Sequence, residues 1–170
     1  MKSVIFTEAS STTAEPTEVQ EVREYFQGGF LSVASLERNL AEFGETELHI
    51  LSEVYDHLVG DEKTSEISKS QNSGVESFKE AVHSAAKEAD VIVVLLTKPV
   101  FESVIEESWQ TLCSEAQSGS VWFFGASKSA LFSVDLDELE QNECEVLTYE
   151  RVGVARISSE MRNTLLNTLN

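Results

Sequence analysis

Three consecutive residues that could take part in proton transfer, Tyr55, Asp56 and His57, follow a short apolar run at Leu48–Leu51. An aspartate beside a histidine suggests general acid–base chemistry. Side chains of consecutive residues on a regular strand or helix point in different directions, so these three cannot converge on one atom. No serine or cysteine nucleophile can be placed against the pair from the sequence. A turn in which Asp56 caps and Tyr55 packs is therefore the competing interpretation.

A second candidate is the segment GASKSA, residues 125–130, which follows another apolar run. Backbone N–H groups of a small-residue loop can bind an anion, and Lys128 would add positive charge. The spacing matches neither a P-loop nor a dinucleotide-binding fingerprint, and a plain turn is the alternative. Lys98 and Lys128 stand out because the chain contains only seven lysines.

The third candidate is the hydroxyl-rich segment TEASSTT, residues 7–13, which contains Ser10 and Ser11. Its hydroxyl groups could surround a polar ligand. The competing interpretation is a polar turn that leads into the next helix.

The net charge of the chain indicates the environment in which the protein works. Its 170 residues include 30 acidic and 12 basic side chains, for a net charge of −18. Such a surface repels itself in dilute salt, whereas molar salt shortens the Debye length to about 3 Å and screens the repulsion. An acidic, lysine-poor surface over a normal apolar core predicts a protein adapted to a salt-rich cytoplasm. An ordinary acidic protein is the alternative. The same charge argues against broad binding to nucleic acid.

Strand and helix patterns alternate along the chain. Apolar runs predict strands at 3–6, 48–51, 91–96, 120–124 and 144–149, with 152–157 as a sixth strand or a continuation. Helical spacing predicts helices at 16–28, 33–43, 75–86, 101–113 and 161–169, with a short helix after Asp135. Ser73 and Glu76 have capping-box spacing, and residues 60–74 read as a long polar loop.

This alternation predicts one α/β domain over residues 1–170, with three layers and a mainly parallel sheet of five or six strands. Ligands of such sheets bind beyond the carboxyl ends of the strands, near the point where the strand order reverses. This rule selects the segments that contain Ser10, Ser52, Lys98 and Lys128.

Residues 30–62 resemble a segment of the YaaA-like superfamily, which includes the C-terminal region of archaeosine synthase. In that family a helix leads into a strand that ends in a Leu-Ser-Ala-x-Tyr-Gly-Leu type motif, and LSEVYDHL supplies Leu51, Ser52, Tyr55 and Leu58. Asp56 stands where the motif has glycine, and His57 is an additional residue. The relatives also carry a lysine after the first strand, which this chain lacks. The resemblance implies an α/β fold with Ser52 and Tyr55 in the wall of a pocket.

We therefore expect a domain that binds a small molecule, such as an anion, or a nucleobase-type ligand. The expected ligand-binding residues are Ser10, Ser11, Ser52, Tyr55, Lys98 and Lys128. The alternatives are a non-catalytic interaction or assembly domain, which could form a homo-oligomer, and a flavodoxin-type nucleotide binder. The residues identify no catalytic group, no reaction and no cofactor. The histidines and cysteines lack metal-ligand spacing, so no metal site is expected. No apolar run reaches the length of about 18 residues that a membrane span requires.

Overall fold

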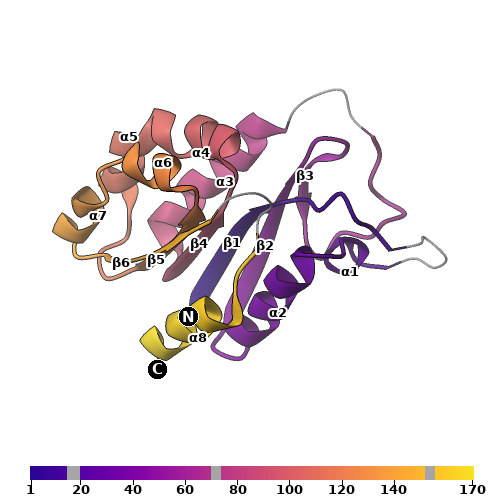
Figure 1. Ribbon diagram of the computed structural model, residues 1–170, viewed down its shortest axis with the longest axis horizontal. Helices are drawn as coiled ribbons and strands as arrows, with labels where there is room; N and C mark the ends of the chain where they lie inside the picture. The colour runs from indigo at the N-terminus through magenta and orange to yellow at the C-terminus, as the bar shows by residue number, and fades with distance from the viewer. Residues whose placement is uncertain (15–19, 70–73, 152–155) are drawn as a thin grey trace.

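The computed structural model describes residues 1–14, 20–69, 74–151 and 156–170. Six strands form one sheet in the order β3-β2-β1-β4-β5-β6 (Figure 1). The pairs β1–β2, β1–β4, β4–β5 and β5–β6 are parallel, and β3 is antiparallel to β2. The strands are β1 (Lys2–Glu8), β2 (Glu45–Ser52), β3 (Asp56–Val59), β4 (Val91–Leu95), β5 (Val121–Ala126) and β6 (Glu145–Glu150).

Helices cover both faces of the sheet, so the predicted three-layer α/β architecture is confirmed (Figure 1). Val4 and Phe6 of β1 belong to the core on one face, and Ile5 belongs to the core on the other face. The first face carries α3 (Val75–Glu88), α4 (Lys98–Val104), the 3₁₀ helix η1 (Glu106–Ser108), α5 (Trp109–Glu115), α6 (Lys128–Phe132) and α7 (Asp137–Gln141). The second face carries α1 (Val22–Tyr25), α2 (Phe30–Ala41) and α8 (Ser159–Thr168).

The apolar run at 91–96 forms the strand β4, which lies between β1 and β5 with parallel pairing on both sides. Every residue of β4 is buried. Because helices cover both faces of β4, neither set of its alternating side chains reaches water, which explains the continuous apolar sequence. The prediction of a central parallel strand is confirmed.

The helix predicted at 16–28 is wrong over its described part. Residues 15–19 lie outside the described chain, and the remainder forms only the four-residue helix α1. Tertiary pairing accounts for the difference. The N–H groups of Val22 and Arg23 donate to the carbonyl oxygens of Glu62 and Gly60, at 2.8 and 3.0 Å, so they are bonded outside the helix.

The single helix predicted at 101–113 is also wrong, because it is divided into α4, η1 and α5. Helix α4 begins earlier than predicted, at Lys98, with a proline in its first turn. At the break between η1 and α5, Trp109 is buried, and its indole Nε1–H donates to the carbonyl of Asp135 at 3.1 Å. This bond ties the start of α5 to the segment that precedes α7.

The sequence did not predict β3. Its first residue, Asp56, has a positive φ of 61° directly after the turn, and the short strand then extends the sheet beside β2. Three other expected features lie wholly or partly outside the described residues: Ser73 of the capping box, part of the loop at 60–74, and most of the strand at 152–157.

In the described chain, Cys113 and Cys144 are buried free thiols. None of the described helices combines the length and apolarity needed to cross a membrane.

Candidate functional site

The carboxyl ends of β1 and β4 lie side by side in the middle of the sheet, where the strand order reverses. Glu8 is the last residue of β1, and Thr97 follows β4 and precedes α4. The carboxylate of Glu8 accepts the Thr97 N–H at 2.5 Å and the Thr97 hydroxyl at 2.9 Å. This pair therefore joins the two strands at the position where ligands of doubly wound sheets bind.

Burial raises the pKa of the Glu8 carboxyl above its ordinary value, although the two hydrogen bonds from Thr97 oppose the shift. The charge of nearby Glu53 raises the pKa further. In the described residues, no lysine, arginine or histidine lies within ion-pair distance of Glu8. Glu8 is therefore a partly desolvated carboxylate that neutral groups alone hold in place.

Ser10 follows Glu8 by two residues, and Ser52 follows Leu51, which pairs in register with Glu8. Ser52 ends β2, and the Ala9 N–H donates to the Leu51 carbonyl at 2.9 Å, so the loop after β1 continues alongside the end of β2. Both serines are buried. The Ser10 Oγ accepts the N–H of Thr12 at 3.1 Å, which holds the loop in a tight turn. Ser11, in contrast, is exposed.

The Ser52 hydroxyl organises the turn between β2 and β3. Its Oγ accepts the N–H groups of Val54 and Tyr55, both at 3.1 Å. Tyr55 is half-buried against the core on the α2 face. A hydrogen bond to Tyr25 is the main cause that raises the pKa of the Tyr55 phenol. Ser52 therefore stabilises the turn between β2 and β3, and Tyr55 packs against the core and contacts Tyr25.

The two lysines begin neighbouring helices at the same edge of the sheet. Lys98 is the first residue of α4, and its Nζ lies 3.9 Å from the Glu102 carboxylate. Lys128 is the first residue of α6, and its Nζ lies 5.7 Å from the centre of the exposed Phe132 ring. Lys128 also lines a shallow hollow of about 680 Å³ with Ser127, Ser129, Phe132 and Ser133.

The predicted site residues therefore fall into two groups. Ser10 and Ser52 flank the end of β1, whereas Lys98 and Lys128 follow β4 and β5. Sequence reasoning missed Glu8, although it lies within the segment that was singled out for its hydroxyl groups. The signal that could have found it is an acidic residue placed directly after an apolar strand.

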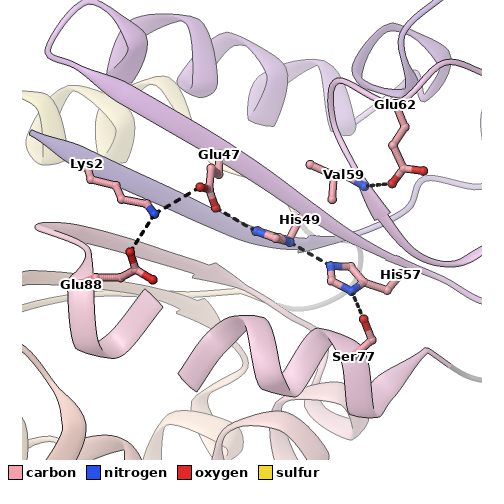
Figure 2. Close-up of polar contacts among 8 residues, drawn as sticks. All are labelled: Lys2, Glu47, His49, His57, Val59, Glu62, Ser77 and Glu88. Carbon is pink, nitrogen blue, oxygen red and sulfur yellow. Dashed lines mark hydrogen bonds and ion pairs between the residues drawn. The ribbon is translucent and has the colours of Figure 1, made fainter. Parts of the chain in front are cut away.

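A second polar arrangement occupies the face of β2 and β3 that meets α3 (Figure 2). The rings of His49 and His57 meet at 2.8 Å, between Nδ1 of His49 and Nε2 of His57. The outer nitrogens lie 3.3 Å from the Glu47 carboxylate and 2.6 Å from the Ser77 hydroxyl. Lys2 binds both Glu47 and Glu88, at 3.2 Å each.

The chemistry of these groups fixes the direction of every hydrogen bond. A carboxylate can only accept, so the neutral His49 donates its Nε2–H to Glu47 and accepts at Nδ1. His57 therefore donates from Nε2 and accepts the Ser77 hydroxyl at Nδ1. Burial and the neighbouring imidazole lower the pKa of His57 to about 4, which makes it a poor base at neutral pH. We infer that this series of hydrogen bonds stabilises the β2–β3 hairpin and does not take part in catalysis.

No family model, no curated protein and no solved structure matches the chain.

Proposed function

We propose that the protein binds a small polar ligand with N–H donor groups, of the nucleobase or amine kind, at the carboxyl edge of the sheet. The observation that carries the proposal is the desolvated carboxylate of Glu8 beside Thr97. Burying a carboxylate without a cation or further N–H donors costs free energy. A ligand that supplies such donors to Glu8 would recover part of that cost on binding.

The order of the strands supports the location. Numbered by their place along the chain, the five parallel strands follow the order 2-1-3-4-5. This is a doubly wound order in which ligands bind where the first and third parallel strands lie side by side. Glu8 and Thr97 occupy those two strand ends.

The negative charge at Glu8 favours ligands with hydrogen-bond donors over ligands with phosphate groups. Two unit charges 4 Å apart interact by about 4 kcal/mol at the effective dielectric of a protein surface. A phosphate beside Glu8 would meet this repulsion, and Glu53 would add to it. The proposal therefore places any anionic group of the ligand toward Lys98 and Lys128. A flavodoxin-type phosphate site in the loop after β1 is therefore less well supported than a site for hydrogen-bond donors.

The resemblance to YaaA-like proteins adds support through one residue. Asp56 stands where the family motif has glycine, and its φ of 61° is the left-handed conformation that glycine adopts at least cost. The turn after Ser52 thus has the backbone form that a glycine would favour. This supports a pocket wall built from Ser52 and Tyr55.

A second candidate function is a contact with another protein chain. Phe132 keeps 75% of its surface exposed, and it forms part of the hollow beside Lys128. A large exposed aromatic ring beside a cation is typical of protein interfaces. Replacing Phe132 by Ser would reduce self-association in sedimentation velocity under this function and would change nothing under the ligand-binding function.

The net charge supports a salt-rich cytoplasm as the working environment. The ligand proposal is therefore tested in molar potassium chloride as well as in dilute buffer. Thermal shifts are compared among three classes of probe: purine and pyrimidine bases, small amines, and inorganic phosphate. The proposal expects a shift with a base or an amine. A response to phosphate alone would contradict it.

A further inference from the structure

A separate cluster of reactive side chains lies where α3 meets η1 and α5. His83 comes from α3, Ser108 ends η1, and Glu115 ends α5. The Nε2 of His83 lies 3.1 Å from the Ser108 Oγ, and its Nδ1 lies 3.3 Å from both carboxylate oxygens of Glu115. A hydroxyl, an imidazole and a carboxylate therefore stand in sequence within hydrogen-bond reach.

The carboxylate determines which tautomer the neutral imidazole adopts. Glu115 can only accept, so the proton of a neutral His83 resides on Nδ1. The free lone pair then lies on Nε2 and faces the Ser108 hydroxyl. The other acceptor near this hydroxyl is the Val104 carbonyl, at a longer distance of 3.4 Å. The Ser108 hydroxyl therefore makes its shorter contact with His83 Nε2, the atom that can remove the serine proton.

The His83 cluster differs from the hydrogen bonds at Ser77 in the group that contacts the second nitrogen of the histidine. His57 is backed by a second imidazole, whose charge lowers the pKa of His57 further. His83 is backed by a carboxylate, which stabilises the imidazolium that forms when the serine proton is taken. His83 is therefore better suited than His57 to act as a general base.

The serine and the histidine each open onto a hollow. Ser108 lines a hollow of about 460 Å³, and His83 lines another of about 520 Å³. Carboxylates and no cations stand among the described residues of the Ser108 hollow, whose charged members are Glu106, Glu107, Asp135 and Glu138. The hollow therefore attracts positively charged molecules and repels anions.

We propose that Ser108, His83 and Glu115 form a hydrolytic site for small acyl esters that carry a positive charge. Ser108 and His83 are the catalytic residues. Glu115 is a positioning residue, which holds the tautomer of His83 and receives a second contact from Lys87 at 3.8 Å. This activity is independent of the ligand site at Glu8.

The reaction balances without a further reagent. His83 Nε2 takes the hydroxyl proton as the Ser108 Oγ forms a bond to the acyl carbon. The ester bond then breaks, and the proton passes from His83 to the leaving alcohol or thiol. In the second half, His83 takes a proton from water as the hydroxide attacks the acyl carbon. The bond from the acyl carbon to Ser108 Oγ then breaks, His83 returns the proton to this oxygen, and the carboxylic acid leaves. The net reaction converts ester and water into acid and alcohol.

Acetylthiocholine is the probe, because it joins an activated thioester to a quaternary ammonium group. We expect the protein to release thiocholine faster than the uncatalysed background. Ser108→Ala should return the rate to that background, and His83→Asn should lower it by about 10²-fold or more. Ser114→Ala is the matched control, since this exposed serine lies on α5, the helix that follows Ser108, and donates to the Thr111 carbonyl. It should leave the rate unchanged.

Two further readouts separate catalysis from structure. A fluorophosphonate should phosphonylate Ser108, with loss of fluoride, as detected by mass spectrometry. Glu115→Gln should lower kcat and change the pH profile, because the amide can also donate and no longer fixes the tautomer. Circular dichroism checks that each variant is folded. A wild-type protein with no turnover and no adduct, or a Ser108→Ala variant that retains turnover, would overturn the proposal.

Discussion

The imidazoles of His49 and His57 share one hydrogen bond of 2.8 Å, which links β2 to β3 across the sheet edge. The His49 ring stacks on Phe6 at a centroid distance of 5.1 Å, and the His57 ring meets the edge of Phe78 at 5.5 Å. Only one of the two facing nitrogens can carry a proton in this bond. A second proton on His49 would lie on Nδ1 and break this bond, whereas a second proton on His57 would lie on its Nδ1 and displace the hydrogen bond that the Ser77 hydroxyl donates.

This relationship predicts a loss of stability in mild acid. The pKa of His57 in the folded protein is about 4, below the ordinary histidine value of 6.5. A depressed histidine pKa means that the unfolded chain binds the proton first, so the contribution is full above about pH 6.5 and is lost as the pH falls toward 4. After allowance for solvent screening of this half-buried ring, the expected loss is about 1–2 kcal/mol.

Urea unfolding in molar sodium chloride at pH 7.5 and 5 measures this loss. Glu47, Lys2 and the hydroxyl of Ser77 are the charged and polar groups that face the two rings. The variant His57→Gln removes the titrating group and should show a smaller difference between the two pH values. Equal differences in the wild type and the variant would show that another group is responsible.

Gly74 should resist substitution because of two separate constraints. Its φ is 67°, and an added Cβ would lie 2.6 Å from the backbone nitrogen of His57. Gly119 has a comparable φ of 83°, but an added Cβ would meet nothing within 4 Å. We expect Gly119→Ala to cost about 1 kcal/mol for the left-handed backbone alone. Gly74→Ala should cost clearly more, because the start of α3 must also move away from β3.

Chemical denaturation of both glycine variants gives the two free energies. The difference between them isolates the close approach of α3 to β3. If the two substitutions cost the same, the tight contact at His57 has no energetic role.

The charge of −18 predicts that the free energy of unfolding rises between about 0.1 M and molar salt. The cause is the screening of repulsion among the carboxylates. Thermal unfolding in increasing sodium chloride measures the effect. Chaotropic and kosmotropic salts at equal low ionic strength separate screening from salting-out. A midpoint that does not respond to sodium chloride would count against adaptation to salt.

The central part of the fold could be predicted from the sequence because burial leaves a pattern there. The run at Val91–Leu95 is apolar throughout, since helices cover both faces of its strand. The strand β3 left no comparable pattern. It has four residues, of which Leu58 alone is buried, and its first residue, Asp56, has a positive φ. Short edge strands are formed by pairing with a neighbour, which local sequence does not reveal.

The site was harder to predict, because its contacts join residues that are distant in the sequence. Glu8 and Thr97 are separated by 89 positions, and His83 and Ser108 by 25. The sequence pattern directed attention to the hydroxyl-rich loop after β1, but it favoured Ser10 over Glu8. The structure gives Ser10 a local partner in Thr12, whereas Glu8 bridges two strands.

Replacing Glu8 by Gln should not weaken the ligand-free protein greatly. A raised carboxyl pKa means that the folded state binds the proton more tightly than the unfolded chain, so this group contributes less stability at neutral pH than at acid pH. Removing the charge removes that cost, while the Gln carbonyl keeps one acceptor for Thr97. Urea denaturation at neutral pH should give a free energy of unfolding within about 1 kcal/mol of the wild type.

Calorimetric titration of the best base or amine probe into the wild type and Glu8→Gln tests the central claim most directly. Glu45→Gln is the control, since this exposed carboxylate begins β2 and pairs in register with Lys2 at the opposite edge of the sheet. We predict that Glu8→Gln lowers the affinity at least tenfold, that Glu45→Gln leaves it unchanged, and that wild-type binding weakens in acid as Glu8 is protonated. Equal affinity in Glu8→Gln and the wild type would contradict a ligand site at the junction of β1 and β4.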